Sequence, residues 1–116
     1  MIERALIVQQ PWADKILSGE KLWEMRSRPT LVRERIGIIA AGTGLILGEV
    51  NLTDSPKAID LKQANQNLDK HQVANISLLE KWCFAWVLNN PKRYETPVKY
   101  KHPRGAVTWV KLEKQL

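Results

Sequence analysis

The segment WCFAWVLNN, residues 82–90, constrains the fold more than any other stretch of this chain. Successive side chains of a strand point to opposite faces of a sheet, and here both sets are apolar. A strand that is apolar on both faces lies inside a sheet that is covered on both sides. One face carries Trp82, Phe84, Trp86 and Leu88, and the other carries Cys83, Ala85 and Val87. We therefore expect a central strand here, with Trp82, Trp86 and Cys83 in the core.

Shorter apolar segments surround this strand and are separated by Gly and Pro. They predict strands at residues 4–9, 21–28, 35–42 and 44–54, and two final strand segments within residues 96–113 around a turn at Pro103 and Gly105. Gly42 and Gly44 are expected to turn the chain between two of them. The total is about six strands, and short strands at this spacing are typical of a small closed or partly closed β-barrel.

Two or three short helices complete the expected elements. The segment QPWADKILSG places Pro11 in the first helical turn, where its missing N–H would be unpaired anyway, and Gly19 at the left-handed position that ends a helix. Residues 59–82 contain no Gly or Pro and are rich in polar residues. They predict one or two further helices, with Asp60 and Ser77 as N-caps. Strands and helices together indicate an α+β fold.

The composition is that of one folded domain, residues 1–116, 44% hydrophobic. No run approaches about 18 apolar residues, so no membrane span is expected. The N-terminus does not resemble a secretory signal, and we expect a cytoplasmic location. Cys83 is the single cysteine, and His71 has no second His or Cys nearby. We therefore expect no disulfide and no metal site, and the absence of nucleotide-binding fingerprints predicts no cofactor.

The positive charge is concentrated in the last third of the chain. The net charge is +6, and residues 81–116 hold eight Lys/Arg and two Asp/Glu. Lys101 and Arg104 lie in the turn KYKHPRG within this region. A local basic field suits a polyanionic ligand, and side chains at such a turn would contact phosphates. A solvated basic surface that serves solubility is the other interpretation that the composition leaves open.

The motif SGEKLWEMRSR, residues 18–28, gathers charges around a tryptophan. In a regular strand Glu24 and Arg26 point to the same face, and Lys21 joins them only if it lies at a bend after Gly19. The group is either an exposed ladder of ion pairs, worth about 0–1 kcal/mol each, or the polar lining of a site. Trp12 and Trp23 are candidates to stack on a base, with ordinary packing as the alternative.

These residues resemble the ASCH domain family, named for its homology to the activating signal cointegrator. The family shows a QPW-type helix start followed by a Gly-x-Lys-x-x-Glu-x-Arg motif. Both motifs are present here, as Gln10, Pro11 and Trp12 and then Gly19, Lys21, Glu24 and Arg26. The resemblance continues through IGIIAAG, LILGEVNLTD and the closing segment from residue 82, and leaves out residues 57–80. The cointegrator-type branch looks most similar, because it shares the QPW start.

The resemblance implies a PUA-like fold, a small β-barrel of about six strands with two or three short helices at its rim. It also implies a cleft between the first helix and the barrel, where the family is thought to bind RNA or nucleotides. Some bacterial members remove the acetyl group of N4-acetylcytidine with a motif lysine, a threonine three residues later and a remote glutamate. Lys21 matches that lysine, but Glu24 stands at the threonine position, so the covalent nucleophile is missing.

The leading hypothesis is therefore an RNA- or modified-nucleoside-binding module. Trp12 would stack on the base, Glu24 would accept from an exocyclic amino group, and Lys21 and Arg26 would hold sugar or phosphate oxygens. We expect Glu24 and Arg26 to face into the cleft, with Lys21 at its edge. The full set of expected ligand-binding residues is Gln10, Pro11, Trp12, Lys21, Glu24, Arg26, Lys101 and Arg104.

Two enzymatic alternatives stay open at this point. The first is a metal-independent amidohydrolase acting on nucleosides of the N4-acetylcytidine type. Its catalytic residues would be Glu24, as general base on water, and Lys21, which would stabilise the oxyanion. The second is a ribonuclease. In each case the expected partner is RNA or a nucleoside.

Overall fold

The strands and helices follow the order that the sequence predicts. The computed structural model describes residues 2–112. Its elements are β1 (Arg4–Val8), α1 (Trp12–Leu17), β2 (Trp23–Arg26), β3 (Glu34–Ala40), β4 (Leu45–Asp54), α2 (Leu61–Gln66), α3 (Leu68–His71), the 3-10 helix η1 (Ile76–Glu80), β5 (Phe84–Lys99) and β6 (Trp109–Lys111).

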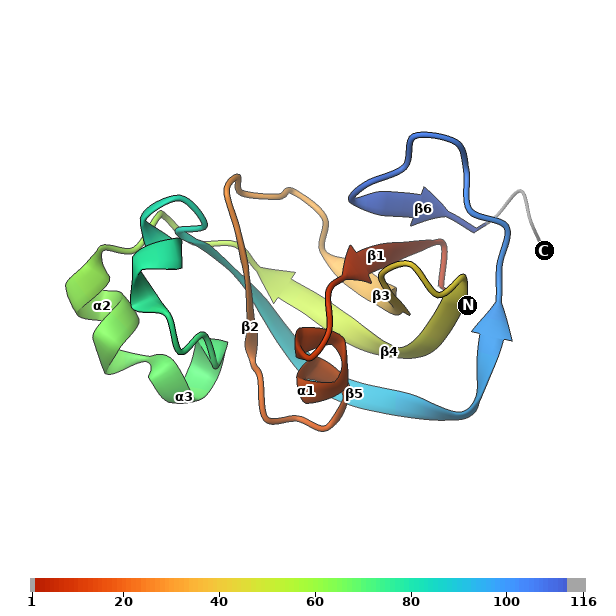
Figure 1. Ribbon diagram of the computed structural model, residues 1–116, viewed down its shortest axis with the longest axis horizontal. Coiled ribbons are helices and arrows are strands. Elements are labelled where there is room, and N and C mark those ends of the chain that lie inside the picture. The colour runs from red at the N-terminus through yellow and green to blue at the C-terminus, as the bar shows by residue number, and fades with distance from the viewer. Residues whose placement is uncertain (1, 113–116) are drawn as a thin grey trace.

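The six strands form one curled sheet in the order β2-β5-β4-β3-β1-β6 (Figure 1). β1 and β3 are parallel neighbours, and the other pairings are antiparallel. Parallel neighbours need a crossover connection. Here the crossover is residues 9–33, which carry α1 and place β2 at the opposite edge of the sheet. The expected α+β architecture with about six strands is therefore present, as an open half-barrel.

The predicted central strand is β5, which lies between β2 and β4. It is longer than expected, because the segment after Thr96 continues the same strand instead of forming a new one. The β4–β5 pairing shifts register at three places, between Ile46 and Gly48, between Glu49 and Asn51, and between Leu52 and Asp54. Such irregularities bend a strand and increase its twist, which allows the long pair to curl.

The expected burial of the WCFAWVLNN segment is correct for Trp86 and wrong for Trp82. Trp86 is 4% exposed and Trp82 is 39% exposed. The physical reason is local, because Trp82 N–H donates to the carbonyl of Leu78 and so ends η1 before β5 begins. Cys83 is half-buried between the two elements. Trp82 therefore lies outside the alternation that places Trp86 in the core.

The helices agree with their sequence signals except at one cap. Gly19 has φ +87°, the left-handed conformation expected where α1 ends. Asp60 caps α2 by accepting from the N–H of Gln63, whose side chain accepts from Asp60 N–H in return. Ser77 is not an N-cap, because it lies inside η1 and donates its hydroxyl to Asn75 Oδ1 at 2.6 Å.

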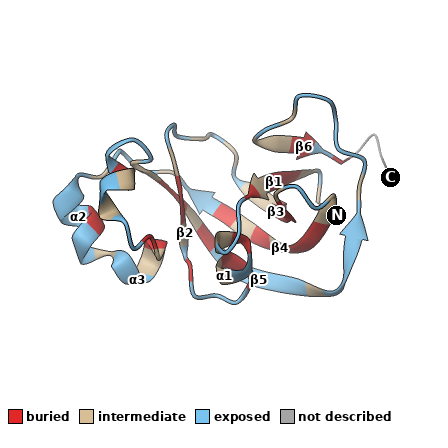
Figure 2. Cartoon of the chain, viewed as in Figure 1, coloured by how far each residue is buried: buried red, intermediate tan, exposed pale blue. Residues whose placement is uncertain are grey.

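Buried residues gather where α1 covers the sheet, and the outer faces of α2 and α3 are exposed (Figure 2). A separate apolar cluster joins the helical segment, residues 61–80, to β2 and β5 through Met25, Ala64, Val73, Leu79 and Ala85. The helical segment is thus anchored at the edge of the sheet that carries the charged motif.

No helix within the described residues is long and apolar enough to cross a membrane.

Gly48→Ala tests how closely β4, which contains Gly48, packs against α1 and β5. A Cβ atom at this position would collide with the backbone carbonyl of Lys92 and would lie 2.9 Å from Cδ2 of Leu17. We expect a loss of about 2–3 kcal/mol in the free energy of unfolding, measured by urea denaturation, because backbone cannot move aside cheaply. The control is Gly42→Ala, which has open space and φ +79° and should lose about 1 kcal/mol. Equal losses in the two variants would contradict the packing argument.

Candidate functional site

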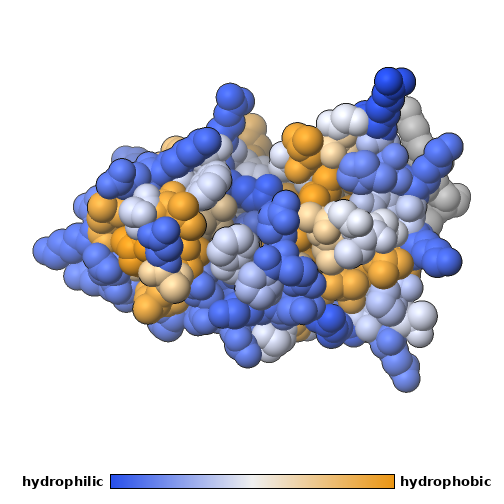
Figure 3. Space-filling view, viewed as in Figure 1, coloured by the Kyte–Doolittle hydropathy of each residue, from blue (hydrophilic) through white to orange (hydrophobic). Residues whose placement is uncertain are grey.

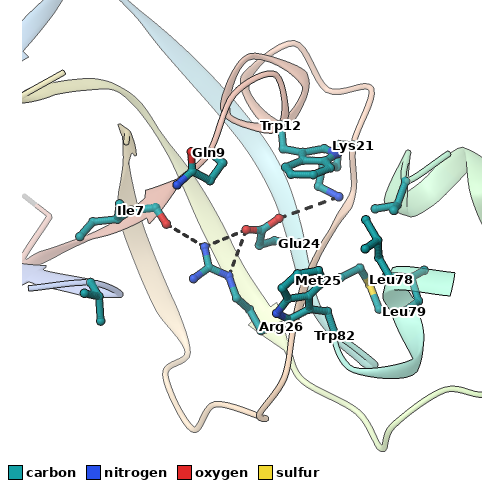
Figure 4. A pocket seen from close by; sticks show the side chains of 12 residues that line it. Ile7, Gln9, Trp12, Lys21, Glu24, Met25, Arg26, Leu78, Leu79 and Trp82 are labelled. Carbon is teal, nitrogen blue, oxygen red and sulfur yellow. Dashed lines mark hydrogen bonds and ion pairs between the residues drawn. The ribbon is translucent and has the colours of Figure 1, made fainter. Parts of the chain in front are cut away.

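A pocket of about 370 Å³ lies between α1, β2, the helical segment and the loop before β6 (Figure 4). Its volume lies within the range of about 300–1,000 Å³ that small-molecule sites occupy. Its walls are mainly apolar, and its charged residues are the three of the motif. The lining residues are Ile7, Gln9, Trp12, Lys21, Glu24, Met25, Arg26, Val73, Leu78, Leu79, Trp82 and Val107.

The floor of the pocket is a carboxylate held between two cations. Oε2 of Glu24 accepts from Nε and Nη2 of Arg26 at 3.0 and 2.8 Å. Oε1 lies 3.9 Å from Nζ of Lys21, too far for a hydrogen bond. Oε1 therefore keeps acceptor capacity on the side of the pocket (Figure 4).

Arg26 also connects the two ends of the curled sheet. It belongs to the edge strand β2, and its Nη2 donates to the carbonyl of Ile7 on β1 at 2.8 Å. In the sheet order, β1 and β6 form the opposite end from β2. The guanidinium therefore spans the open side of the half-barrel, and its bonds to Glu24 fix the carboxylate at that opening.

Lys21 is more deeply buried than the expected position at the edge of the cleft. Its side chain is 1% exposed, compared with 9% for Glu24 and 21% for Arg26. It lies after Gly19 and before β2 begins, at the bend that the sequence required for it to meet Glu24. Nζ donates to the carbonyl of His71 and lies 5.9 Å from the ring centre of Trp12.

This environment changes the acidity of the Lys21 ammonium. The pKa of Lys21 is lowered to about 8, mainly because burial disfavours the charged form; the charge of Glu24 opposes this shift, and repulsion from Lys15 and Arg26 adds to it. The amine is therefore far easier to deprotonate than a lysine in water. A buried lysine of this kind can act as a donor in one protonation state and as an acceptor in the other.

His71 holds the helical turn that Lys21 contacts. It is fully buried, its Nε2 lies 2.7 Å from the carbonyl of Ala64, and its Nδ1 accepts from the N–H of Val73 at 2.9 Å. Because Nδ1 accepts, the ring proton is on Nε2, and both nitrogens serve the backbone. Residues 2–112 contain no group of three or more His, Cys, Asp or Glu side chains that could hold a metal ion.

The sequence-predicted residues divide into two groups. The pocket brings together Trp12, Lys21, Glu24 and Arg26. Gln10 and Pro11 lie outside it, since Gln10 Oε1 accepts from the N–H of Asp14 and Pro11 precedes α1 as its N-cap residue. Both residues begin the helix that carries Trp12, and neither lines the pocket.

The two basic residues Lys101 and Arg104 also lie outside the pocket lining. They are exposed on the loop of residues 100–108, which contributes Val107 to the pocket rim. Lys101 lines a different cavity near Tyr94 and Tyr100. These two cations therefore share a loop with one residue of the pocket rim, but neither lines the pocket.

Sequence reasoning missed the wall that the helical segment contributes. Val73, Leu78, Leu79 and Trp82 line the pocket opposite α1, and Figure 3 shows apolar surface over this segment in an otherwise mainly hydrophilic region. The available signal was the pair Leu78 and Trp82, spaced four residues apart at the end of a polar stretch. Gln9, beside the expected Gln10, was missed because neighbouring residues at a helix start cannot be told apart by periodicity.

Comparison with known proteins gives the family and the fold. A family model described as the ASCH domain matches residues 6–98. The crystal structure of ASCH from Zymomonas mobilis is similar, with a TM-score of 0.73 and 18% identity over 97% of this chain and 88% of that chain. Serine-to-alanine and tyrosine-to-phenylalanine mutants of that protein give TM-scores of 0.72 and 0.73 at 18% and 17% identity. These two cover 97% and 98% of this chain, and 89% and 92% of theirs. No curated protein matches the chain.

This protein therefore belongs to the ASCH domain family, as the QPW start and the Gly-x-Lys-x-x-Glu-x-Arg motif predicted. The likeness to the solved structures confirms the expected small α+β fold of the PUA-like type. At this level of identity the solved structures establish the fold alone.

Lys21→Met tests the burial of the amine. Lys21 has an ordinary pKa of 10.5 when unfolded and about 8 when folded, so between these pH values the unfolded state binds more protons and stability rises with pH. The free energy of unfolding of the wild type, relative to Lys21→Met, should be flat below about pH 7 and rise by about 3 kcal/mol by about pH 10.5.

Urea denaturation of both proteins across this pH range gives the difference directly. Taking the difference also removes the contributions of Tyr94 and Tyr100, whose phenols have an ordinary pKa of 10.0 in the unfolded chain and a pKa that burial raises in the folded protein. A difference that stays constant with pH would mean that the ammonium is as well solvated in the folded state as in the unfolded chain.

Proposed function

We propose that this protein binds a nucleoside unit, within RNA or as a modified nucleoside, in the pocket between α1 and the sheet. One observation carries the proposal, namely the carboxylate of Glu24, which lies between Lys21 and Arg26 on the floor of a mainly apolar pocket with two indole rings in its walls. Trp12 and Trp82 both line this pocket. Flat apolar walls around a single hydrogen-bonding edge are what a nucleobase requires, because every base has a π-face and a polar rim.

Glu24 would read the polar edge of the base. Its Oε2 is occupied by Arg26, whereas Oε1 retains acceptor capacity toward the pocket. An ionised carboxylate accepts hydrogen bonds and cannot donate them, so the favoured partner is an amino group or a ring N–H. Adenine, cytosine and guanine offer an amino group, whereas uracil offers a ring N–H alone.

Lys21 and Arg26 would support the ligand as well as the carboxylate. A protonated lysine has three N–H donors, and one of those of Lys21 goes to the carbonyl of His71. Arg26 uses Nε and Nη2 for Glu24 and Ile7, which leaves Nη1 for a sugar or phosphate oxygen. Membership of the ASCH family agrees with this assignment.

The direct test is calorimetric titration with the four ordinary nucleosides, N4-acetylcytidine and short single-stranded RNA. Trp82→Leu should weaken binding about tenfold or more, because base stacking is worth about 1–3 kcal/mol. The matched control is Trp23→Leu, since Trp23 is a half-buried tryptophan of β2 that does not line the pocket. Glu24→Gln should weaken the binding of all four nucleosides, because each base offers an N–H donor that a carboxylate accepts more strongly than an amide oxygen does. Absence of saturable binding for every compound in the panel would contradict the proposal.

A second candidate function is hydrolysis of an acylated amino group on the base. The observation that favours it is the buried Lys21 with its pKa near 8, 3.9 Å from Glu24. Glu24 would take a proton from water while the hydroxide attacks the acyl carbon, and Lys21 would stabilise the oxyanion. Glu24 would then give this proton to the leaving nitrogen as the C–N bond breaks, which releases the free amine and the carboxylic acid. The same titration samples of N4-acetylcytidine, analysed by chromatography, distinguish the two functions. Cytidine release that Glu24→Gln abolishes supports the enzyme, and saturable binding without release supports the binding module.

The basic loop predicts a salt dependence for RNA. Lys99, Lys101 and Arg104 are exposed at the end of β5 and on the loop that forms part of the pocket rim. Affinity for single-stranded RNA should fall as salt rises, with a slope that corresponds to about 2–4 phosphates. Neutralising the three residues together to Gln should flatten this slope, as followed by titration at increasing salt. An unchanged slope in the triple variant would assign these cations to a solvated surface.

A further inference from the structure

A second cavity of about 500 Å³ adjoins the first pocket on the far side of Arg26. The two cavities share the side chains of Arg26 and Trp82 in their linings. Trp82 is 39% exposed, so it is open to a ligand at this boundary. The residues that line the second cavity are Arg26, Ser27, Arg28, Pro29, Thr30, Trp82, Trp86, Thr108 and Trp109.

The chemistry of the second cavity differs from that of the first. Its lining holds two arginines, three hydroxyl side chains and no carboxylate. A third cation lies beside it, since Nζ of Lys81 is 5.6 Å from the ring centre of Trp82. Arg26 is paired with Glu24, but no carboxylate of the described residues pairs with Arg28 or Lys81. These two cations and the hydroxyls favour an anionic, hydrogen-bonding ligand over a neutral one.

The wall of this cavity is held in place by its own contacts. The rings of Trp86 and Trp109 stack with centroids 5.8 Å apart and an angle of 14° between planes. Nε1 of Trp86 donates to the carbonyl of Arg28 at 2.9 Å, which fixes the backbone of the turn after β2. The exposed side chain of Arg28 is therefore presented from an anchored backbone, and it lines the same cavity as Arg26, whose Nη1 is not used for Glu24 or Ile7.

We propose that the second cavity binds the nucleotide next to the one in the first pocket, so the ligand is a single-stranded RNA segment of at least two nucleotides. The linking phosphate lies at the boundary, where Arg26 and Arg28 supply its donors. Trp82 then stands between the two units. This inference rests on the proposed function of the first pocket and specifies its ligand as a polynucleotide instead of a free nucleoside.

The test compares ligands of increasing length on the intact protein. The four homodinucleotides of cytidine, uridine, adenosine and guanosine are titrated against their own nucleosides and their 3′- and 5′-monophosphates. The best dinucleotide should bind about tenfold or more tightly than its nucleoside, and also more tightly than either monophosphate, because the second unit adds stacking and phosphate contacts.

Arg28→Gln locates the gain at the second cavity. The variant keeps the Arg28 carbonyl that anchors Trp86, so the fold is preserved. It should lose about threefold to tenfold in affinity for the dinucleotide, with a lower salt slope, and keep the affinity for the nucleoside. The matched control is Lys62→Gln, which removes an exposed charge on α2 that lines neither cavity and should leave both affinities unchanged.

The outcomes separate this inference from the function on which it rests. A nucleoside that binds as tightly as its dinucleotide, or a monophosphate that does so, would overturn the two-nucleotide ligand and leave the first pocket as a nucleoside site. An equal loss in Arg28→Gln and Lys62→Gln would also overturn it, because the effect would then be one of net charge. No binding of any compound would overturn both proposals together.

Discussion

The contact on which this structure depends is the one between Arg26, Glu24 and the carbonyl of Ile7. The sheet is curled but open, so its two ends have no backbone ladder between them. The guanidinium of Arg26, at one end, donates to the carbonyl of Ile7 at the other end at 2.8 Å and also donates to the buried carboxylate of Glu24. Its planar donors serve both partners at once, which a lysine ammonium does less well. The opening of the half-barrel is thereby given a defined width and a polar floor.

Lys21 adds a second cation to the same carboxylate and so leaves the floor with an excess of positive charge. Burial of this charge is costly, and the carbonyl of His71 offsets part of the cost by accepting from Nζ. That carbonyl lies in the last residue of α3, where helix carbonyls lack intrahelical partners. One ammonium therefore stabilises the end of a helix and the floor of the pocket. The helical segment, which the motif resemblance does not cover, is tied to the motif by this contact.

Local patterns in the sequence predicted the sheet and the polar floor, and failed where long-range packing decides. Alternation identified β5 and the shared face of Glu24 and Arg26, because both follow from the period of a strand. Gly19 predicted the bend, but the depth of Lys21 depends on α3, which lies 50 residues away in the chain. Trp82 was misplaced because η1 holds its N–H, and a short 3-10 turn has no strong signal in composition. The remaining wall residues come from segments that are far apart in the sequence, so no local pattern predicts that these segments meet.

The crossover between the two parallel strands carries the charged residues of the pocket on one continuous piece of chain. Residues 9–33 leave β1, form α1, add β2 to the far edge of the sheet and return to β3 beside β1. The four charged and aromatic residues of the floor and the first wall, Trp12, Lys21, Glu24 and Arg26, all lie within this one connection. At its two ends this connection continues into β1 and β3, which are neighbouring interior strands of the sheet. Exchanging this one short, contiguous connection would therefore change the charged floor and the first wall of the pocket, while the other strands keep their own residues.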